Sequence, residues 1–315
     1  MSVSYHRTVD VLQGYPVATP FDRAEWYALL AEAGAVPLVV QAPGCDGGAA
    51  LALTRTNGRL EPLRNWYSFA WRAHGHDPQA LRAIAASLRN VSPRVVLWPL
   101  PDEDGTATRL EQAFAAAGWQ VGREECDRNH VLPVAGRSFA GYWADRPGEL
   151  RSTVRRKAGG VEAAVSTGFA EEEWDAYEAV YRSSWKPGEG DPRLLRRFAR
   201  HEGLAGRLRL GLARAAGKVV AAQFWTVERG TAYIHKLAHC EEAGRLSAGT
   251  VLSAAMFAHA IDRDRVDWID FGTGDDRYKR DWMELVRPRY RLDCLDPRQP
   301  RAWPALARRA LRRLA

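Results

Sequence analysis

The segment DFGTGDDRYKRDW, residues 270–282, carries the clearest structural signal in this chain. The apolar run at residues 266–271 predicts a buried strand that ends near Asp270. Gly272 and Gly274 then predict a turn into a short helix over residues 276–283. In α/β sheets, ligands bind at such turns beyond the carboxyl ends of strands. The segment therefore predicts an α/β fold with a candidate binding site at this turn, although a capped turn alone also explains the glycines.

The same order of elements occurs in both halves of the chain. Before the segment, residues 208–214, 219–227 and 231–238 predict three strands, and residues 247–263 predict a helix. In the first half, Asn57-Gly58 predicts a hairpin between strands at residues 51–55 and 59–63. A helix at residues 78–89 and a buried strand at residues 95–100 follow. Each half thus has a hairpin, a helix and a buried strand, and the boundary is expected near residues 133–139.

The positive charge is concentrated at the end of the sequence. The net charge is +7, but residues 1–150 contain 14 arginines, no lysine and 16 acidic residues. From Arg287 onward there are nine arginines and only two aspartates. Residues 303–315 predict an amphipathic helix. Its expected apolar face is Trp303, Leu306, Ala307, Ala310, Leu311 and Leu314, and its basic face is Arg308, Arg309, Arg312 and Arg313. Such a helix either packs on the body of the protein or lies on a membrane surface. Nucleic acid is not expected as a partner, because no binding motif accompanies the charge.

Several protein classes are disfavoured by composition. No run of 18 apolar residues is present, so a transmembrane helix is not expected. Residues 1–10 lack the basic and apolar regions of a secretory signal. The four cysteines at positions 45, 126, 240 and 294 form no CxxC pair, so neither a metal nor a redox site is expected. The expected location is the cytoplasm, with peripheral contact to the inner face of a membrane as an option.

Two clusters near the segment contain candidate site residues. His235 and Lys236 lie on the predicted strand at residues 231–238, where the histidine is either a base or a core residue. Arg245, Ser247, Gly249 and Thr250 surround the start of the next helix. Free backbone N–H groups at a helix start bind phosphate, so these residues suggest a pyrophosphate site. A simple helix cap with Ser247 as the N-cap residue is the alternative.

These motifs together resemble the FemAB/CelD-like branch of the GNAT acyltransferase superfamily. The resemblance rests on Asp-x-Gly-x-Gly-Asp followed by Tyr278-Lys279-x-x-Trp282, on residues 151–160, on Ser184-Trp185-Lys186 and on residues 246–250. It is close over residues 151–282 and looser in the first half. It implies an α/β (α+β) fold of two tandem GNAT-like halves, each a mixed, mostly antiparallel sheet flanked by helices. The expected divisions are residues 1–135, 136–290 and a basic tail at 291–315.

The resemblance also implies an N-acyltransferase. Members of the family move an acyl group from a thioester, usually acyl-coenzyme A, to an amine by direct attack, with no tightly bound cofactor and no metal. The expected base is His235 or Asp270 and the expected acid is Tyr278, while Arg245, Ser247, Gly249 and Thr250 are expected at the coenzyme A pyrophosphate. Expected contacts to substrate are Trp185, Lys236, Asp275, Lys279, Trp66 and Tyr67, although the last two also suit an ordinary core.

The acceptor and the donor stay open at this point. An amino sugar, a cell-envelope precursor and a long-chain lipid amine are all compatible acceptors. A FemX-like aminoacyl transferase that uses charged tRNA is one alternative, and a long helical arm is expected in that case. A binding protein without catalytic activity on the same scaffold is another.

Overall fold

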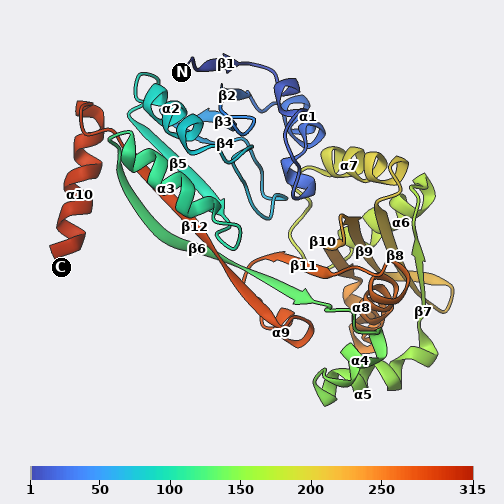
Figure 1. The fold of residues 1–315 in the computed structure, drawn as a ribbon. Coiled ribbons are helices and arrows are strands. Elements are labelled where there is room, and N and C mark those ends of the chain that lie inside the picture. The colour runs from blue at the N-terminus through green and yellow to red at the C-terminus, as the bar shows by residue number, and fades with distance from the viewer. Residues whose placement is uncertain (1, 315) are drawn as a thin grey trace. The chain divides into compact units, whose positions relative to one another are not determined.

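The chain folds into two compact units. A computed structural model describes residues 2–314, with the side chains of residues 312–314 left outside the description. Unit 1 consists of Met1–Arg128 and Arg287–Ala315, and unit 2 consists of Asn129–Val286 (Figure 1). The chain therefore leaves unit 1 a few residues before the boundary expected near residue 135. It also returns to unit 1 at Arg287, so residues 287–315 are a part of that unit and not a separate tail.

Unit 1 contains a mixed sheet with helices beside it. Its elements are β1 (Ser4–His6), α1 (Ala24–Glu32), β2 (Leu38–Ala42), β3 (Ala49–Thr56), β4 (Arg59–Pro62), α2 (Pro78–Leu88), β5 (Arg94–Leu100), α3 (Thr106–Ala116), the start of β6 (Gln120–Pro133), most of β12 (Leu285–Leu295) and α10 (Trp303–Leu314). Strands β1 to β4 pair in antiparallel succession, β4 pairs with β5 in parallel, and β5 pairs with β12 in antiparallel. Helices α2 and α3 lie side by side (Figure 1).

Local sequence explains the best-predicted parts of unit 1. The pairing of Thr56 with Arg59 leaves a two-residue turn, and Asn57 and Gly58 both have positive φ, +48° and +77°. Such a turn needs two left-handed residues, which is why Asn-Gly predicts it correctly. Strand β12 was not predicted from the sequence. Its interrupted polar pattern, with Pro288 inside, hides a strand whose Leu292 and Cys294 are fully buried.

Unit 2 has one parallel strand pair in an otherwise antiparallel sheet. Its elements are α4 (Phe139–Ala144), α5 (Gly148–Lys157), β7 (Glu162–Ser166), α6 (Glu171–Arg182), α7 (Pro192–Leu204), β8 (Leu208–Ala215), β9 (Lys218–Glu228), β10 (Thr231–His239), α8 (Ala248–Ala258), β11 (Trp268–Thr273) and α9 (Lys279–Trp282). The strands lie in the order β7-β8-β9-β10-β11, followed by the end of β6. Only β10 and β11 are parallel. The predicted class of mixed, mostly antiparallel sheets flanked by helices is confirmed.

Helix α7 was also missed by sequence analysis, although its start is well marked. Asp191 accepts a hydrogen bond from the Leu194 backbone N–H at 2.9 Å, and Pro192 occupies the first turn. Leu194, Leu195 and Phe198 are buried at helical spacing. The many arginines of this helix mask its apolar face in the sequence.

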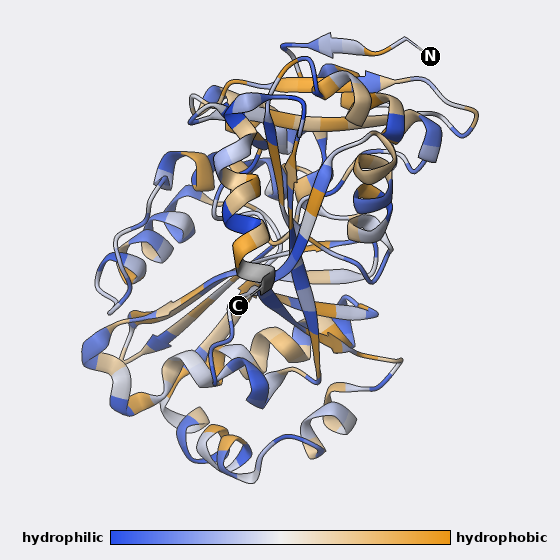
Figure 2. Cartoon of the chain, turned by 90° about the vertical axis from the view of Figure 1, so that its left-hand side faces the viewer, coloured by the Kyte–Doolittle hydropathy of each residue, from blue (hydrophilic) through white to orange (hydrophobic). Residues whose placement is uncertain are grey.

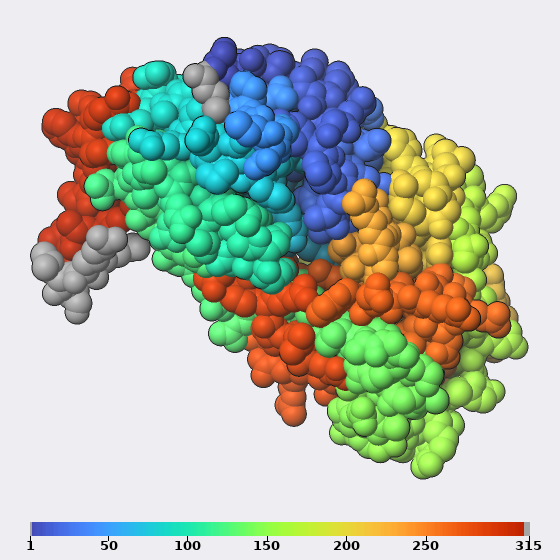
Figure 3. Space-filling model, in the orientation of Figure 1, coloured from blue at the N-terminus to red at the C-terminus, as the bar shows by residue number. Residues whose placement is uncertain are grey.

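The C-terminal helix α10 packs on unit 1 through an unexpected face. Figure 2 shows hydrophilic and hydrophobic residues interspersed along this helix, Figure 3 shows the helix at the edge of unit 1, and Arg309 donates hydrogen bonds to the carbonyls of Gln120 and Asp293. Ala302 is buried and Ala305, Leu306 and Arg309 are half-buried, whereas Trp303 and Leu311 are 57% and 66% exposed. The hydrogen bonds of Arg309 to β6 and β12 turn the side of the helix that carries Arg309 toward the sheet. Part of the expected apolar face is therefore exposed. Leu314, Arg312 and Arg313 lie outside the described side chains. No helix in residues 2–314 is long and apolar enough to cross a membrane.

Candidate active site

Strands β10 and β11 of unit 2 separate part-way along their length. They pair in parallel from Thr231 with Trp268 to Tyr233 with Asp270. Beyond that point β10 stays paired with β9 as far as His239, and β11 stays paired with β6 as far as Thr273. Each strand changes register here, β10 between Ile234 and Lys236 and β11 between Asp270 and Thr273. A β-bulge bends a strand, so these irregularities account for the separation. One edge of each strand is left without a strand partner.

Helix α8 begins just after the separated end of β10 and has no side-chain cap. Ser247 stands at the N-cap position with a left-handed backbone, φ +51° and ψ +33°, and its side chain makes no capping bond. The predicted cap is therefore absent, because a capping serine needs an extended backbone. The Ser247 carbonyl accepts bonds from the N–H groups of Thr250 and Val251 at 3.0 and 3.1 Å. The preceding N–H groups, of Ala248 and Gly249, stay outside the hydrogen bonds of the helix.

The other residues expected at the pyrophosphate lie around this helix start. Arg245 is exposed on the 3₁₀ turn Glu241–Leu246, and Thr250 is half-buried in the first turn of α8. A Cβ added at Gly249 would lie 3.2 Å from Nδ1 of His239. The glycine therefore makes room for a side chain of the protein itself, in addition to any ligand.

Three of the five lysines gather near the separated strands. The Lys236 ammonium on β10 is 3.1 Å and 3.0 Å from the two carboxylate oxygens of Glu189. The Lys186 ammonium lies 5.9 Å from the centre of the Trp185 ring. Burial, followed by repulsion from Lys236, lowers the pKa of Lys186 to about 8. Lys186 is thus partly neutral near physiological pH.

His239 lies at the end of β10 beside the loop that carries Lys186. Its ring centre is 4.2 Å from that of Trp185, which is half exposed. Burial, followed by the charge of Lys186, lowers the pKa of His239 below its ordinary value. The ring is therefore neutral at pH 7.

Tyr278 is the exposed aromatic residue of the β11–α9 turn. Its ring meets Phe271 edge-on at 5.6 Å. Burial and the neighbouring Asp276 carboxylate raise the pKa of Tyr278 to about 12. Asp276 also acts on the pKa of Lys186, so the tyrosine and this lysine share one electrostatic environment. A hydroxyl with this pKa stays protonated at neutral pH and can donate its proton.

His235 is held apart from this group by aromatic packing. Its Nε2 is 2.8 Å from the Thr226 hydroxyl, and its ring stacks on Phe224 at 4.8 Å with Phe198 edge-on at 5.3 Å. These contacts fit the core-residue alternative better than the role of base. The register change after Ile234 places His235 and Lys236 side by side on the strand, which simple alternation does not predict.

The remaining predicted residues of unit 2 shape the β11–α9 turn. Asp270 accepts hydrogen bonds from the Asn129 amide and the Gly272 N–H, both at 2.8 Å. The buried Lys279 ammonium bonds to the carbonyls of Thr273 and Gly274. Asp275 accepts bonds from Arg280 and lies 3.1 Å from the ring nitrogen Nε2 of His130. Asp270, Asp275 and Lys279 therefore hold the turn in place.

Trp66 and Tyr67 belong to unit 1. Tyr67 is buried and Trp66 is 63% exposed, with their ring centres 5.4 Å apart. Tyr67 fits the core alternative, and a role for either residue in acceptor binding stays a prediction.

A family match covers the site that these residues form. Residues 145–280 match the acetyltransferase (GNAT) domain family. Those residues are a GNAT domain. The match includes α8, β10, β11 and the loop of Lys186, so the site described above lies within the GNAT domain. A search of the curated proteins finds no match to the sequence.

Solved structures extend the likeness over nearly the whole chain. FemX shares 11% identity at a TM-score of 0.66, covering 93% of this chain and 97% of FemX. L-PGS from Bacillus licheniformis shares 12% at 0.57, covering 92% and 96%. The C-terminal domain of a putative lysylphosphatidylglycerol synthetase from Agrobacterium fabrum shares 14% at 0.56, covering 91% and 90%. At such identities the likeness establishes only that these proteins share a fold with nearly the whole of this chain.

Sequence analysis did not select Lys186 or His239 as site residues. Lys186 is named there only inside the motif Ser184-Trp185-Lys186, and His239 has only Cys240 beside it, with no second pair at metal-ligand spacing. Each residue lies next to the end of an element: Lys186 in the loop after α6, and His239 at the end of β10, the strand that precedes the Arg245–Thr250 cluster. These positions are the sequence signal that could have identified them.

Proposed function

We propose that the GNAT domain transfers an acyl group from an acyl-coenzyme A-type thioester to an amine, by direct attack in a ternary complex. The observation that supports this most is the separation of β10 from β11 beside the uncapped start of α8. A helix start with free N–H groups suits a pyrophosphate. An unpaired strand edge supplies backbone N–H groups for the carbonyl oxygen of the thioester, which becomes anionic during the reaction.

The proposed reaction needs one proton acceptor and one proton donor. The amine nitrogen attacks the thioester carbonyl carbon, so that a C–N bond forms and the C–S bond breaks. The attacking nitrogen gives a proton to the neutral amine of Lys186, and the hydroxyl of Tyr278 gives a proton to the departing thiolate. Lys186 suits the first task because its pKa is about 8, and Tyr278 suits the second because its hydroxyl stays protonated.

Acyl transfer can be tested with purified full-length protein. The protein is incubated with acetyl- and long-chain acyl-coenzyme A and with a panel of amino sugars and lipid amines, while free thiol is recorded. Amine-dependent thiol release is expected, and calorimetry is expected to show coenzyme A binding. Absence of both would overturn the proposal. Thiol release that persists fully in Tyr278→Phe would remove the tyrosine from the mechanism.

An aminoacyl ester of tRNA is the second candidate donor. The fold shared with FemX, over 93% of this chain and 97% of FemX, supports this candidate. The longest helix among residues 2–314, α7, has 13 residues, so these residues contain no long helical arm of the kind expected for a FemX-like enzyme. Transfer of a labelled amino acid from charged tRNA, without thiol release from acyl-coenzyme A, would favour this candidate. Failure of both transfers would favour a non-catalytic binding protein.

Peripheral membrane contact through α10 is a separate part of the proposal. Trp303 and Leu311 are exposed on this helix, and Arg308 is exposed between them in sequence. Exposed apolar side chains next to arginines bind anionic lipid surfaces. Such contact places the protein at the inner face of a membrane. Flotation with anionic vesicles is expected to fall when both Trp303 and Leu311 are changed to alanine, and unchanged flotation would contradict the contact.

A further inference from the structure

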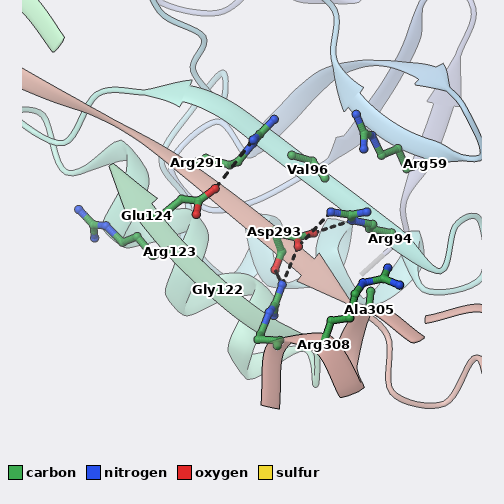
Figure 4. A pocket seen from close by; sticks show the side chains of 11 residues that line it. Arg59, Arg94, Val96, Gly122, Arg123, Glu124, Arg291, Asp293, Ala305 and Arg308 are labelled. Atoms are coloured by element: carbon green, nitrogen blue, oxygen red, sulfur yellow. Dashed lines mark hydrogen bonds and ion pairs between the residues drawn. The ribbon is translucent and has the colours of Figure 1, made fainter. Parts of the chain in front are cut away.

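Unit 1 contains a cavity lined by arginines. It has a volume of about 460 Å³ and lies among four strands and helix α10 (Figure 4). Its lining residues are Arg59, Arg94, Val96, Gly122, Arg123, Glu124, Arg291, Asp293, Ala305, Arg308 and Arg309. Six of these are arginines and two are acidic. The lining thus has a surplus of positive charge, although the first 150 residues have a slightly negative balance.

Asp293 organises the floor of this arginine cavity. Its carboxylate accepts bonds from Arg94 at 2.7 and 3.1 Å and from Arg309 at 2.8 Å (Figure 4). Arg309 also bonds to the carbonyl of Gln120, and a Cβ at Gly122 would approach its guanidinium carbon to 3.0 Å. One carboxylate thus holds two guanidinium groups in place, and their combined charge is only half neutralised.

Some arginine donors in the cavity have no acceptor. Among the described residues, Arg308 has no hydrogen bond or ion pair, and Figure 4 shows none to its neighbours. The contact between Nη1 of Arg291 and Oε1 of Glu124 is long, at 3.8 Å, and the buried Nε of Arg291 has no hydrogen-bond partner. A buried N–H without an acceptor costs free energy that an anion would recover. Arg123 differs, because Asp102, Glu111 and Thr108 occupy its N–H groups.

The size and charge of the cavity select a class of ligand. Cavities of this volume hold small molecules. Guanidinium groups bind phosphate oxygens in pairs, with strong charge-assisted bonds. Unit 1 contains no lysine, so the use of arginine in place of lysine says nothing about the ligand. The positions and ion pairs of the guanidinium groups indicate the ligand instead. Glu124 and Asp293 in the lining disfavour an extended nucleic-acid backbone, which would pass both carboxylates.

We propose that the arginine cavity of unit 1 binds the phosphate groups of a small phosphorylated molecule, with Arg308 as the principal unoccupied donor and Arg291, which makes only a 3.8 Å ion pair with Glu124, as a second donor. A diphosphate fits the surplus charge best. Free diphosphates and the phosphate of a lipid headgroup are two sources of this chemistry. The site lies in the unit that does not contain the GNAT domain, so the inference is independent of the proposed transfer reaction.

Calorimetry with inorganic pyrophosphate on the full chain tests this inference. Arg308→Gln is expected to raise Kd about tenfold, which corresponds to about 1.4 kcal/mol. Arg308 is exposed and without partners, so the variant should fold normally, as thermal unfolding can verify. Arg301→Gln is the matched control, because Arg301 is an exposed arginine on the preceding turn and does not line the cavity. It should change Kd less than twofold.

Two further measurements locate the site and its source. The pyrophosphate titrations are repeated with variants that also carry Ser247→Asp, which weakens the proposed phosphate site at the start of α8. A loss of pyrophosphate affinity caused by Arg308→Gln in this background then arises at the cavity. Vesicles of phosphatidylglycerol with phosphatidylcholine are compared with phosphatidylcholine alone. Arg308-dependent vesicle binding that pyrophosphate inhibits indicates a lipid headgroup, whereas pyrophosphate binding alone indicates a free ligand. Two results would overturn the inference. One is a Kd for pyrophosphate weaker than 1 mM, which corresponds to a binding free energy of about −4.1 kcal/mol. The other is an equal loss of pyrophosphate affinity in Arg308→Gln and Arg301→Gln.

Discussion

The two units differ at the start of the helix that connects their two parallel strands. In unit 1, α2 connects the parallel strands β4 and β5, and the Asp77 carboxylate caps it by accepting a bond from Ala80 N–H at 2.8 Å. In unit 2, α8 connects the parallel strands β10 and β11 and has no side-chain cap. A negative charge of the protein itself thus occupies the position in unit 1. The corresponding position in unit 2 is free to accept a negative charge from a ligand.

The lysines follow the same division. All five lie in unit 2, and three of them surround the separated strands, whereas the cations of unit 1 are all arginines. A lysine changes its pKa readily when buried, while arginine stays charged. A lysine of unit 2 can therefore transfer a proton, whereas the arginines of unit 1 are suited to binding.

The largest effect is expected from Lys186→Met. Loss of the proposed proton acceptor should lower kcat about 100-fold, within the usual range for a general base. In the unaltered protein the neutral amine is the active form, so activity should rise with pH through about 8, and this rise should disappear in the variant. Rates measured from pH 6 to 10 test both points. Lys218→Met, at an exposed strand end, is the control. An unchanged pH profile in Lys186→Met would exclude the proposed role.

A smaller effect is expected when unit 2 is made to resemble unit 1. Ser247→Asp introduces a carboxylate at the start of α8, and aspartate tolerates the left-handed backbone there. Repulsion should raise the Kd for coenzyme A about tenfold, or about 1.4 kcal/mol. Calorimetry measures this, with Ser247→Asn as the neutral control of the same shape. Equal affinities in the two variants would mean that the phosphates bind elsewhere.

The smallest effect is expected from removal of the cap in unit 1. Asp77→Ala should lower the denaturant concentration at the midpoint of unfolding without changing the transfer rate. Backbone N–H groups, first that of Ala80, lower the pKa of Asp77. The charged cap therefore stabilises the protein above the unfolded-state pKa, and this contribution is lost as pH falls through the lower folded-state pKa. Denaturant unfolding at pH 7 and pH 3 tests this. A difference between variant and parent that is larger at pH 3 would contradict the sign.

Residues with strong local preferences were predicted well. Asn57, Gly58, Gly272 and Gly274 have positive φ angles that few other residues adopt, so the sequence predicts the turns at these positions. The pairing of β12 with β5 and the packing of His235 between Phe198 and Phe224 depend on residues far apart in the chain. The pKa of Lys186 is lowered by its burial in the fold and then by repulsion from Lys236, 50 positions away. Such properties arise only when the chain is folded, and a search for motifs does not detect them.

The return of the chain to unit 1 at Arg287 has a consequence for biosynthesis. Strand β12, the partner of β5, leaves the ribosome only after the whole of unit 2. Domains generally fold as they are synthesised, from the N-terminus onward. Unit 2 can therefore complete its own sheet first, while β5 waits for its neighbour. A nascent chain stopped near residue 286 should contain a protease-resistant unit 2 attached to an unfinished unit 1.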